Sequence, residues 1–275
     1  MKVIATIALL LGLAGVAHAQ YTPVAGQSAQ KLTVARDPYG NAKGNQYDLA
    51  PDGAFDGQTV AVIQLYNESA FDFKVVKDAL KEKGFSVARW TAMPSPKDLE
   101  AALAKSSQLW IIAGQMRLLT DEHVAIIRRF WEAGHGLYIW GDNDPYYVDA
   151  NVLGKALFDT TMDGNLPGDK PVGLQSSSGK PGLVPDLLLT TSLEHIYEGI
   201  TIATIHPSAD LRPLIVGSAG NLVAAFYDKA GRRAIFDGGF TRLYNKWDTA
   251  GTARYVKNAA AWLVNAERFG AKVAK

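Results

Sequence analysis

The chain has 275 residues, of which 48% are hydrophobic and 20% are charged, a composition typical of a globular protein with a real core. Its 28 basic and 27 acidic residues nearly cancel, and no basic tail or acidic block is present, so a nucleic-acid partner is not expected. The absence of cysteine excludes disulfide bonds, a thiol nucleophile and a thiolate metal site.

Residues 1–19 have the features of a secretory leader. Lys2 gives a positive start, an apolar run follows from Val3 to Val16, and Ala17-His18-Ala19 fits the small-x-small cleavage rule. The run is too short for a comfortable membrane span. We therefore predict a signal peptide over 1–19, a mature chain without a membrane span that begins at Gln20, and a periplasmic or secreted location.

Residues 20–57 are predicted to form an N-terminal arm. The segment is rich in Gly, Ala, Gln, Asn, Asp and Pro and has few large aliphatic residues, so it indicates irregular structure. The composition fits a flexible linker and an ordered arm packed on the following domain equally well.

Four short apolar runs predict β-strands, and helical patterns separate them. Thr59 to Gln64 is apolar almost without interruption, as expected for a parallel strand buried on both faces. Ser95-Pro96 and Thr120 are cap signals that open two of the helices. Strands that alternate with helices predict a mostly parallel α/β sheet with right-handed crossovers. The predicted strands cover residues 59–64, 85–90, 108–113 and 136–140.

The second half of the chain has a less regular pattern. Residues 159–200 contain many Gly, Asp, Pro and Ser residues and predict a long surface excursion, with a short helix at 191–199. Alternating and apolar runs then predict two short strands, a β-hairpin and a final helix that complete a domain over 58–270. The strands are expected at 201–205 and 212–217, the hairpin at 221–228 and 232–237, and the helix at 251–269.

The phrase from Leu118 to Asp142, which reads LLTDEHVAIIRRFWEAGHGLYIWGD, resembles the class I glutamine amidotransferase-like superfamily. The closest likeness is to its branches without the catalytic cysteine, such as trehalose-utilisation-like proteins and auxiliary domains of gliding and transport systems. The resemblance extends over roughly residues 58 to 268. It implies a flavodoxin-like three-layer sandwich with a nucleophile turn after a central strand.

The chain departs from this family at both catalytic positions. The amidotransferase members of the family carry Cys at the turn, where this chain has Gly141, Asp142 and Asn143. They also carry His and Glu near the last strand, whereas His206-Pro207-Ser208 precedes the hairpin here and Phe236 to Arg242 contains no His. Glutaminase chemistry by the family mechanism is therefore not expected.

A candidate site lies where the chain leaves the predicted strands at their carboxyl ends, the edge at which open α/β sheets bind ligands. Arg242 is expected to face Asp142 or Asp144, either to bind an anion or to form a structural ion pair. The two aspartates themselves suit a cation site, acid–base chemistry, or simple turn and helix-cap hydrogen bonds. The predicted site residues are Asp142, Asn143, Asp144, Tyr146, Arg242, Asn67, Gln115 and Thr241.

Three functions are compatible with these residues. The first is an exported amidotransferase-like domain without glutaminase chemistry that binds a small polar ligand or an envelope partner at the carboxyl edge. The second is a hydrolase that uses Asp142 or Asp144, with or without a divalent cation. The third is a purely structural envelope component. No cofactor or metal is expected, because the histidines lack zinc-ligand spacing.

Overall fold

The computed structural model describes residues 21–22, 30–31, 34–67, 71, 73–244, 247 and 250–269. The chain divides into two units, Met1–Ala35 and Arg36–Lys275. In the first unit, β1 (Tyr21–Thr22) pairs antiparallel with β2 (Gln30–Lys31). The predicted signal peptide lies outside the described residues. The second unit carries the sheet and the candidate site.

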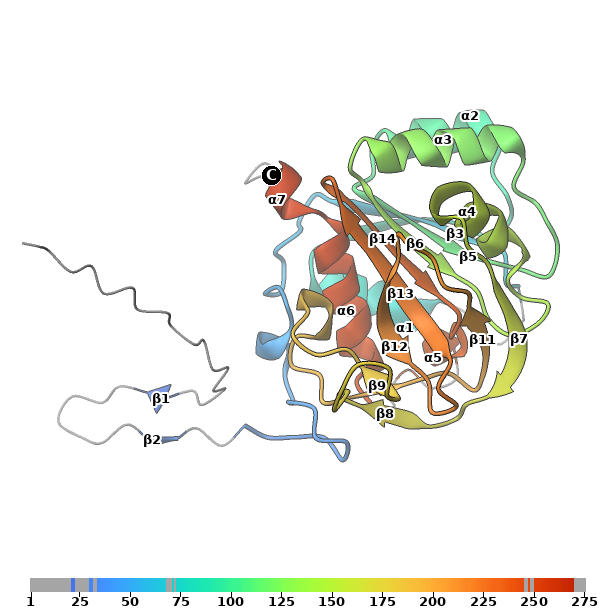
Figure 1. The fold of residues 1–275 in the computed structure, drawn as a ribbon. Coiled ribbons are helices and arrows are strands. Elements are labelled where there is room, and N and C mark those ends of the chain that lie inside the picture. The colour runs from blue at the N-terminus through green and yellow to red at the C-terminus, as the bar shows by residue number, and fades with distance from the viewer. Residues whose placement is uncertain are drawn as a thin grey trace, which may run out of the picture. The chain divides into compact units, whose positions relative to one another are not determined.

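An eight-stranded sheet with the order β4-β3-β5-β6-β14-β13-β12-β9 forms the centre of the second unit (Figure 1). The first five strands in this order are mutually parallel, and the last three extend the sheet by antiparallel pairing. The parallel strands are β4 (Ser86–Trp90), β3 (Thr59–Gln64), β5 (Gln108–Ile112), β6 (Gly136–Trp140) and β14 (Arg232–Asp237). The others are β13 (Leu222–Lys229), β12 (Arg212–Val216) and β9 (Gly182–Leu183).

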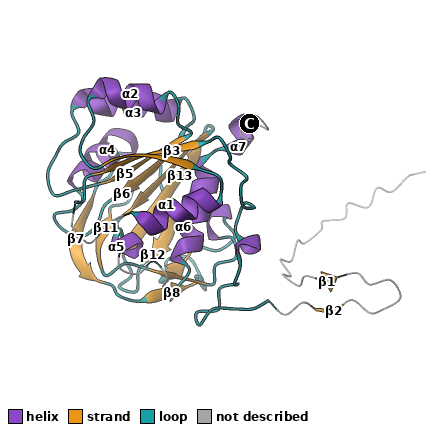
Figure 2. Cartoon of the chain, turned by 180° about the vertical axis from the view of Figure 1, so that it is seen from behind, coloured by secondary structure: helices purple, strands orange, loops and turns teal. Residues whose placement is uncertain are grey.

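Helices cover both faces of this sheet, as Figures 1 and 2 show from opposite sides. On one face, α1 (Lys74–Glu82) and α6 (Thr252–Leu263) share a core cluster with the strands, and on the other face α2 (Pro96–Leu103), α3 (Asp121–Glu132) and α4 (Val148–Phe158) share a second cluster. The predicted mostly parallel three-layer α/β sandwich, with a hairpin and helix at its carboxyl end, is confirmed. Short helices are η1 (Asn45–Tyr47), η2 (Leu188–Thr190), α5 (Thr241–Tyr244) and α7 (Ala266–Phe269).

Burial explains why the parallel strands are continuous apolar runs in the sequence. Every residue from Val60 to Ile63 is fully buried. Successive side chains point to opposite faces, so that Tyr138 and Trp140 pack on the α1 and α6 side, whereas Leu137 and Ile139 pack on the other side. If this alternation continues past the end of the strand, the residue two positions after Trp140, which is Asp142, also points to the α1 and α6 side.

Residues 159–200 contain several strands. β7 (Met162–Pro167) pairs with β11 (Thr201–Ile205), and β8 (Pro171–Gly173) pairs with β10 (His195–Tyr197). The predicted helix at 191–199 is wrong, because the strand β10 forms within that range, at His195–Tyr197. Ser192 has a left-handed φ of 56°, which interrupts a right-handed helix, and Ile196 and Tyr197 are both buried by extended pairing.

The predicted final helix at 251–269 is interrupted. α6 ends at Leu263, and Asn265 adopts a left-handed φ of 60° before α7 begins. The Asn265 side-chain amide donates hydrogen bonds to the carbonyl oxygens of Gly134 and Gly231, at 2.9 and 2.8 Å. This residue therefore ties the end of α6 to two loops of the sheet.

Residues 36–57 form an ordered arm on α1 and α6. Asp48 is buried and lies between three cations, Lys83 at 2.9 Å, Arg254 at 2.9 Å and Lys257 at 2.8 Å. The next residue, Leu49, donates its backbone N–H to the side-chain oxygen of an α6 asparagine at 2.7 Å. We call Asp48, Lys83, Arg254 and Lys257 the arm anchor. Residues 36–57 therefore pack on the domain, and residues 23–29 and 32–33 of the predicted arm lie outside the described residues.

Across the described residues, every helix falls short of the length and apolar character needed to cross a membrane.

Candidate functional site

The turn after β6 begins with a tightly packed glycine. Gly141 donates its N–H to the Asp237 carbonyl oxygen at 2.8 Å, and its own carbonyl oxygen accepts from the Phe240 N–H at 3.2 Å. A Cβ at this position would lie 2.5 Å from the Met162 sulfur and 3.1 Å from Tyr147 Cβ. The turn therefore lies against β14 and β7 with no room for a side chain, and it directs the next residue inward.

Asp142 is a buried acid at the end of the central strand. Asp142 as a whole is only 2% exposed. Among the described residues, its Oδ1 atom has no hydrogen-bond partner. Burial holds the pKa of Asp142 well above its usual range, although the backbone N–H groups of Asn143 and Thr241 and the charge of Arg242 act in the opposite direction. The neutral acid therefore persists to a higher pH than in an exposed aspartate.

Arg242 pairs with Asp237, and the described residues contain no ion pair between it and Asp142 or Asp144. The guanidinium Nη1 donates to Asp237 Oδ2, and both side chains are completely buried. The predicted ion pair between Arg242 and a turn aspartate is therefore not formed, although the charge of Arg242 still acts on Asp142. The physical reason is the turn between the partners: a Cβ on Gly239 would lie 2.4 Å from the Arg242 Nη2 atom, so this glycine lets the guanidinium fold back onto its own strand end.

Two buried tyrosines complete the surroundings of this ion pair. Tyr138 and Tyr255 both donate their hydroxyls to Asp237 Oδ2, at 3.1 and 3.2 Å. Burial raises the pKa of each phenol well above its ordinary value, so both remain neutral donors. Because Asp237 neutralises the charge of Arg242, this guanidinium is not available to bind an anion. It instead holds the end of β14 in position.

The other turn residues are more exposed. Asn143 accepts a hydrogen bond from Thr201 Oγ1 at 2.9 Å and donates to the Asp144 carbonyl oxygen at 2.9 Å. Asp144 is exposed and accepts from the Tyr147 hydroxyl at 2.8 Å; burial and this carboxylate raise the pKa of Tyr147 to about 12. Tyr146 accepts the Asp142 N–H with its carbonyl oxygen at 3.1 Å. Asp144 thus forms a hydrogen bond within the turn, which is one of the alternatives that the sequence left open.

The remaining three predicted residues separate into two groups. Thr241 lies beside Asp142 and accepts the Ile200 N–H with its hydroxyl at 2.8 Å. Asn67 and Gln115 are exposed on the loops after β3 and β5, and Asn67 donates to the Thr91 carbonyl oxygen at 3.0 Å. In the described part of the chain, no hydrogen bond joins Asn67 or Gln115 to the other predicted residues.

Aromatic rings gather over the same edge. The Tyr66 ring lies 5.1 Å from Tyr146, 4.8 Å from Phe240 and 6.0 Å from Tyr244. These residues come from the loops after β3, β6 and β14. The available sequence signal was the recurrence of aromatic residues directly after predicted strands, which indicates a shared edge but not ring contact.

A second unpartnered polar atom lies close to Asp142 along the chain. Trp140 is fully buried, and among the described residues its Nε1–H has no acceptor. Trp140 ends β6, and Asp142 follows two residues later. Arg242 lies near both, since its guanidinium carbon is 5.6 Å from the centre of the Trp140 ring and its charge acts on Asp142. Buried polar groups are nearly always hydrogen-bonded, so two exceptions at one strand end need an explanation.

The described residues do not offer a metal centre or an amidotransferase dyad. No three His, Asp or Glu side chains in this part of the chain come together as metal ligands. His206 is exposed, its Nε2 lies 2.9 Å from Asp163 Oδ2, and it follows β11 along the chain and not β14. Because the chain has no cysteine, the edge can hydrogen-bond a ligand but cannot form a thioester.

No protein-family model and no curated protein matches this chain. Among solved structures, a cytoplasmic protein from Salmonella typhimurium matches with a TM-score of 0.52 and 10% identity, over 74% of this chain and 98% of that one. At this identity the likeness shows the fold alone. Two others match with TM-scores of 0.41 and 0.40, each at 10% identity. They are an exo-β-1,4-mannosidase from Opitutaceae bacterium strain TAV5 (76% of this chain, 36% of that one) and the glutaminase domain of CTPS from Trypanosoma brucei with bound acivicin (74% and 94%).

Proposed function

We propose that this chain is an exported, non-catalytic member of the class I glutamine amidotransferase-like superfamily that binds a small polar ligand at the carboxyl edge of its sheet. The observation that carries this proposal is the buried Asp142 carboxyl group, which has an unpartnered Oδ1 atom at the position of the family's nucleophile turn. A ligand that reaches this turn can provide the missing hydrogen bond. A small molecule suits the site better than a protein surface because Asp142 is only 2% exposed.

The surroundings of Asp142 indicate the chemistry of the ligand. Among the described residues, the cation whose charge acts on Asp142 is Arg242, and it is neutralised by Asp237, so this part of the chain presents no free positive charge there. Burial keeps Asp142 protonated to a raised pH, and the acid then donates a hydrogen bond, as does Trp140 Nε1. A ligand with carbonyl, carboxamide or hydroxyl oxygens would accept from both. The rings around Tyr66 would provide apolar walls for its carbon atoms.

One observation favours a hydrolase. A carboxyl group with a raised pKa is suited to general-acid catalysis, and Asp142 has this property. Hydrolysis also requires a base or nucleophile close to the same substrate atom. Asp144, the second acid that this hypothesis requires, is exposed and accepts the Tyr147 hydroxyl. The binding function therefore accounts for more of the geometry.

A thermal-shift screen of the parent protein and Asp142→Asn tests the proposed site. Amino acids, their amides, neutral sugars and Mg²⁺ or Ca²⁺ salts are suitable probes. A ligand at one hundred times its Kd would stabilise the parent by about 2.7 kcal/mol, which corresponds to roughly 5 to 10 °C in a domain of this size. The Asp142→Asn variant should reduce this shift strongly, because an amide N–H is a weaker hydrogen-bond donor than a carboxylic O–H. Asp144→Asn, on the same turn but exposed, is the matched control and should keep the shift.

The stability of Asp142→Asn separates binding from a structural role. Without ligand we expect a change below about 1 kcal/mol at acidic pH, since the neutral acid and the amide are similar in size and polarity. The folded-state pKa is raised, so parent stability should fall as pH rises above the ordinary value of 3.8, whereas the variant should lack this decrease. Strong destabilisation of the variant at acidic pH, with no probe that shifts the parent, would leave only the structural hypothesis.

Glutamine should not be a substrate. The chain has no cysteine, so the thioester intermediate of glutaminase chemistry cannot form. Purified protein incubated with glutamine should release no more ammonia than a protein-free control. Ammonia release that disappears in Asp142→Asn would contradict both the absence of glutaminase chemistry and the non-catalytic proposal.

A further inference from the structure

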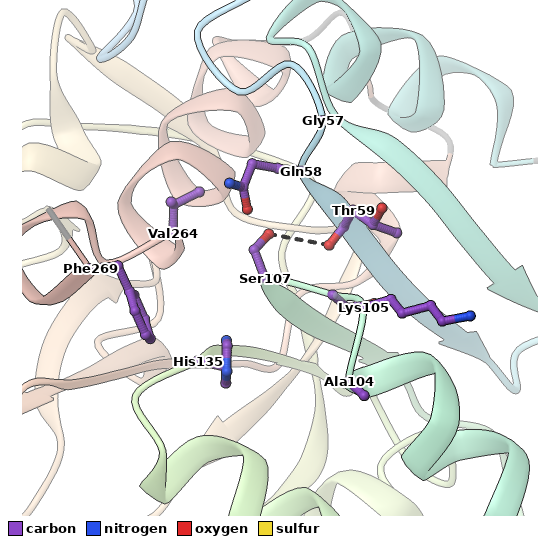
Figure 3. Close-up of a pocket in the computed structure, with 10 residues that line it drawn as sticks. Gly57, Gln58, Thr59, Ala104, Lys105, Ser107, His135, Val264 and Phe269 are labelled. Carbon is purple, nitrogen blue, oxygen red and sulfur yellow. Dashed lines mark hydrogen bonds between the residues drawn. The ribbon is translucent and has the colours of Figure 1, made fainter. Parts of the chain in front are cut away.

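A pocket of about 370 Å³ opens at the amino edge of the parallel strands, opposite to the edge that carries Asp142. Its volume is at the lower end of the range for small-molecule sites, which is roughly 300 to 1,000 Å³. We call it the amino-edge groove. Figure 3 shows the side chains that line it, which lie before or at the start of β3, β5 and β6 and at or after the ends of α2, α6 and α7. They are Gly57, Gln58, Thr59, Ala104, Lys105, Ser106, Ser107, His135, Val264 and Phe269.

One end of the groove is apolar and aromatic. The His135 ring stacks between Phe130, at a centroid distance of 4.4 Å, and Phe269, at 5.2 Å. Burial lowers the pKa of His135, so its imidazole is neutral at neutral pH and adds no charge. Val264 lies beside Phe269 in Figure 3 and extends this apolar end. The rings and the valine together would bury a hydrocarbon or aromatic group.

The other end of the groove has a cation. Lys105 follows α2, is exposed, and forms no ion pair with any residue in the described ranges. The last carbonyl oxygens of α2 are already occupied, since Ala102 accepts from the Lys105 N–H and Leu103 accepts from the Ser106 N–H, both at 3.0 Å. No aspartate or glutamate is among the lining residues.

Polar side chains lie between the two ends. Gln58 and Ser107 border the middle of the groove in Figure 3, and Ser107 donates its hydroxyl to the Thr59 carbonyl oxygen at 3.2 Å. Lys105 extends away from His135 in the same view, so the aromatic end and the cationic end are separated. A ligand that uses both must be elongated.

We propose that the amino-edge groove binds a small amphipathic monoanion, with an aromatic or branched hydrocarbon group against His135 and Phe269 and a carboxylate against Lys105. The apolar surface would provide affinity, and the ammonium would select an anion over its neutral analogue. This site is separate from the carboxyl edge and does not depend on the function proposed for Asp142.

Calorimetric titration with 4-phenylbutyrate and its neutral analogue 4-phenylbutanamide tests the proposal. The parent should bind the carboxylate with saturation and about tenfold more tightly than the amide, because only the carboxylate gains the charge-assisted contact. Lys105→Gln should remove this difference while leaving amide binding unchanged. Phe269→Ala should weaken both probes at least about fivefold, because it removes the shared apolar contact.

Two variants serve as controls. Lys97→Gln removes an exposed lysine from the first turn of the same helix and should preserve the tenfold preference. Asp142→Asn should bind both probes as the parent does. The proposal is overturned if the parent shows no saturable binding, if Lys105→Gln weakens both probes equally, or if Asp142→Asn abolishes binding while Lys105→Gln does not. The last result would place the probe at the carboxyl edge.

Discussion

Replacing Asp237 with Asn is expected to lower the free energy of unfolding by about 3 to 5 kcal/mol. The substitution preserves size but removes the only carboxylate paired with Arg242 among the described residues, and both side chains are 0% exposed. Arg242 would keep its neutral contacts, the carbonyl oxygens of Tyr197 and Glu198 at 3.1 Å each. Neutral acceptors do not compensate a buried guanidinium charge as a carboxylate does, so the folded state should lose most of the electrostatic stabilisation. Urea denaturation followed by fluorescence measures the loss.

Asp228→Asn is the matched control for this result. It makes the same chemical change on the neighbouring strand, where Asp228 is 38% exposed and lies 3.5 Å from Arg233. Arg233 also pairs with Glu267 at 2.8 Å, so it keeps a carboxylate partner, and the loss in Asp228→Asn should be less than about 1 kcal/mol. The double variant Asp237→Asn with Arg242→Met removes both buried charges and should be more stable than Asp237→Asn alone. A loss of 1 kcal/mol or less in Asp237→Asn would show that this ion pair does not hold the strand ends together.

The ion pair between Asp237 and Arg242 also shows why the sequence could predict the position of the candidate site but not the contacts within it. The apolar runs at Val60 to Ile63 and Leu137 to Trp140 are continuous because both sheet faces are covered, so strand positions and the carboxyl edge were predictable. The partner of Arg242 was not predictable, because three aspartates follow or end neighbouring strands. Which aspartate pairs with Arg242 depends on the close turn at Gly239. In the sequence, the only sign of such a turn is the glycine itself.

Contacts between residues far apart in the sequence explain the other differences between the predicted and the observed structure. The 191–199 segment contains polar and apolar residues at spacings that suit a short helix, but Ile196 is buried by pairing with Val172, over twenty residues earlier. Tertiary contacts of this type override local propensity. The aromatic contacts around Tyr66 similarly depend on three loops that only the sheet order brings together.

The arm is a third case, because its anchor joins residues about two hundred positions apart. Asp48 lies in a segment of low hydrophobicity, and its sequence surroundings do not distinguish a linker from an ordered arm. Its partners Arg254 and Lys257 occupy the same face of α6, three residues apart, where two cations require a counter-charge. The arm provides that charge, so we expect its attachment to depend on one carboxylate.

Asp48→Asn should therefore lower the free energy of unfolding by about 3 kcal/mol or more and release the arm. The side chains of Lys83, Arg254 and Lys257 are 1%, 9% and 8% exposed, so removal of Asp48 would leave three largely buried cations close together. Glu82 and Asp52 remain as partners for the two lysines, but they are about half exposed and would compensate only in part.

Hydrogen exchange identifies which part of the protein responds. The Leu49 N–H, which donates to Asn258 Oδ1, should lose protection in Asp48→Asn, whereas amides in β5 and β6 should open only in global unfolding. The control is Asp52→Asn, which removes an arm carboxylate that is 53% exposed and 2.7 Å from Lys83. It should cost less than about 1 kcal/mol and leave Leu49 protected. Equal losses in the two variants would mean that the total charge of the arm, and not the buried position of Asp48, holds it on α6.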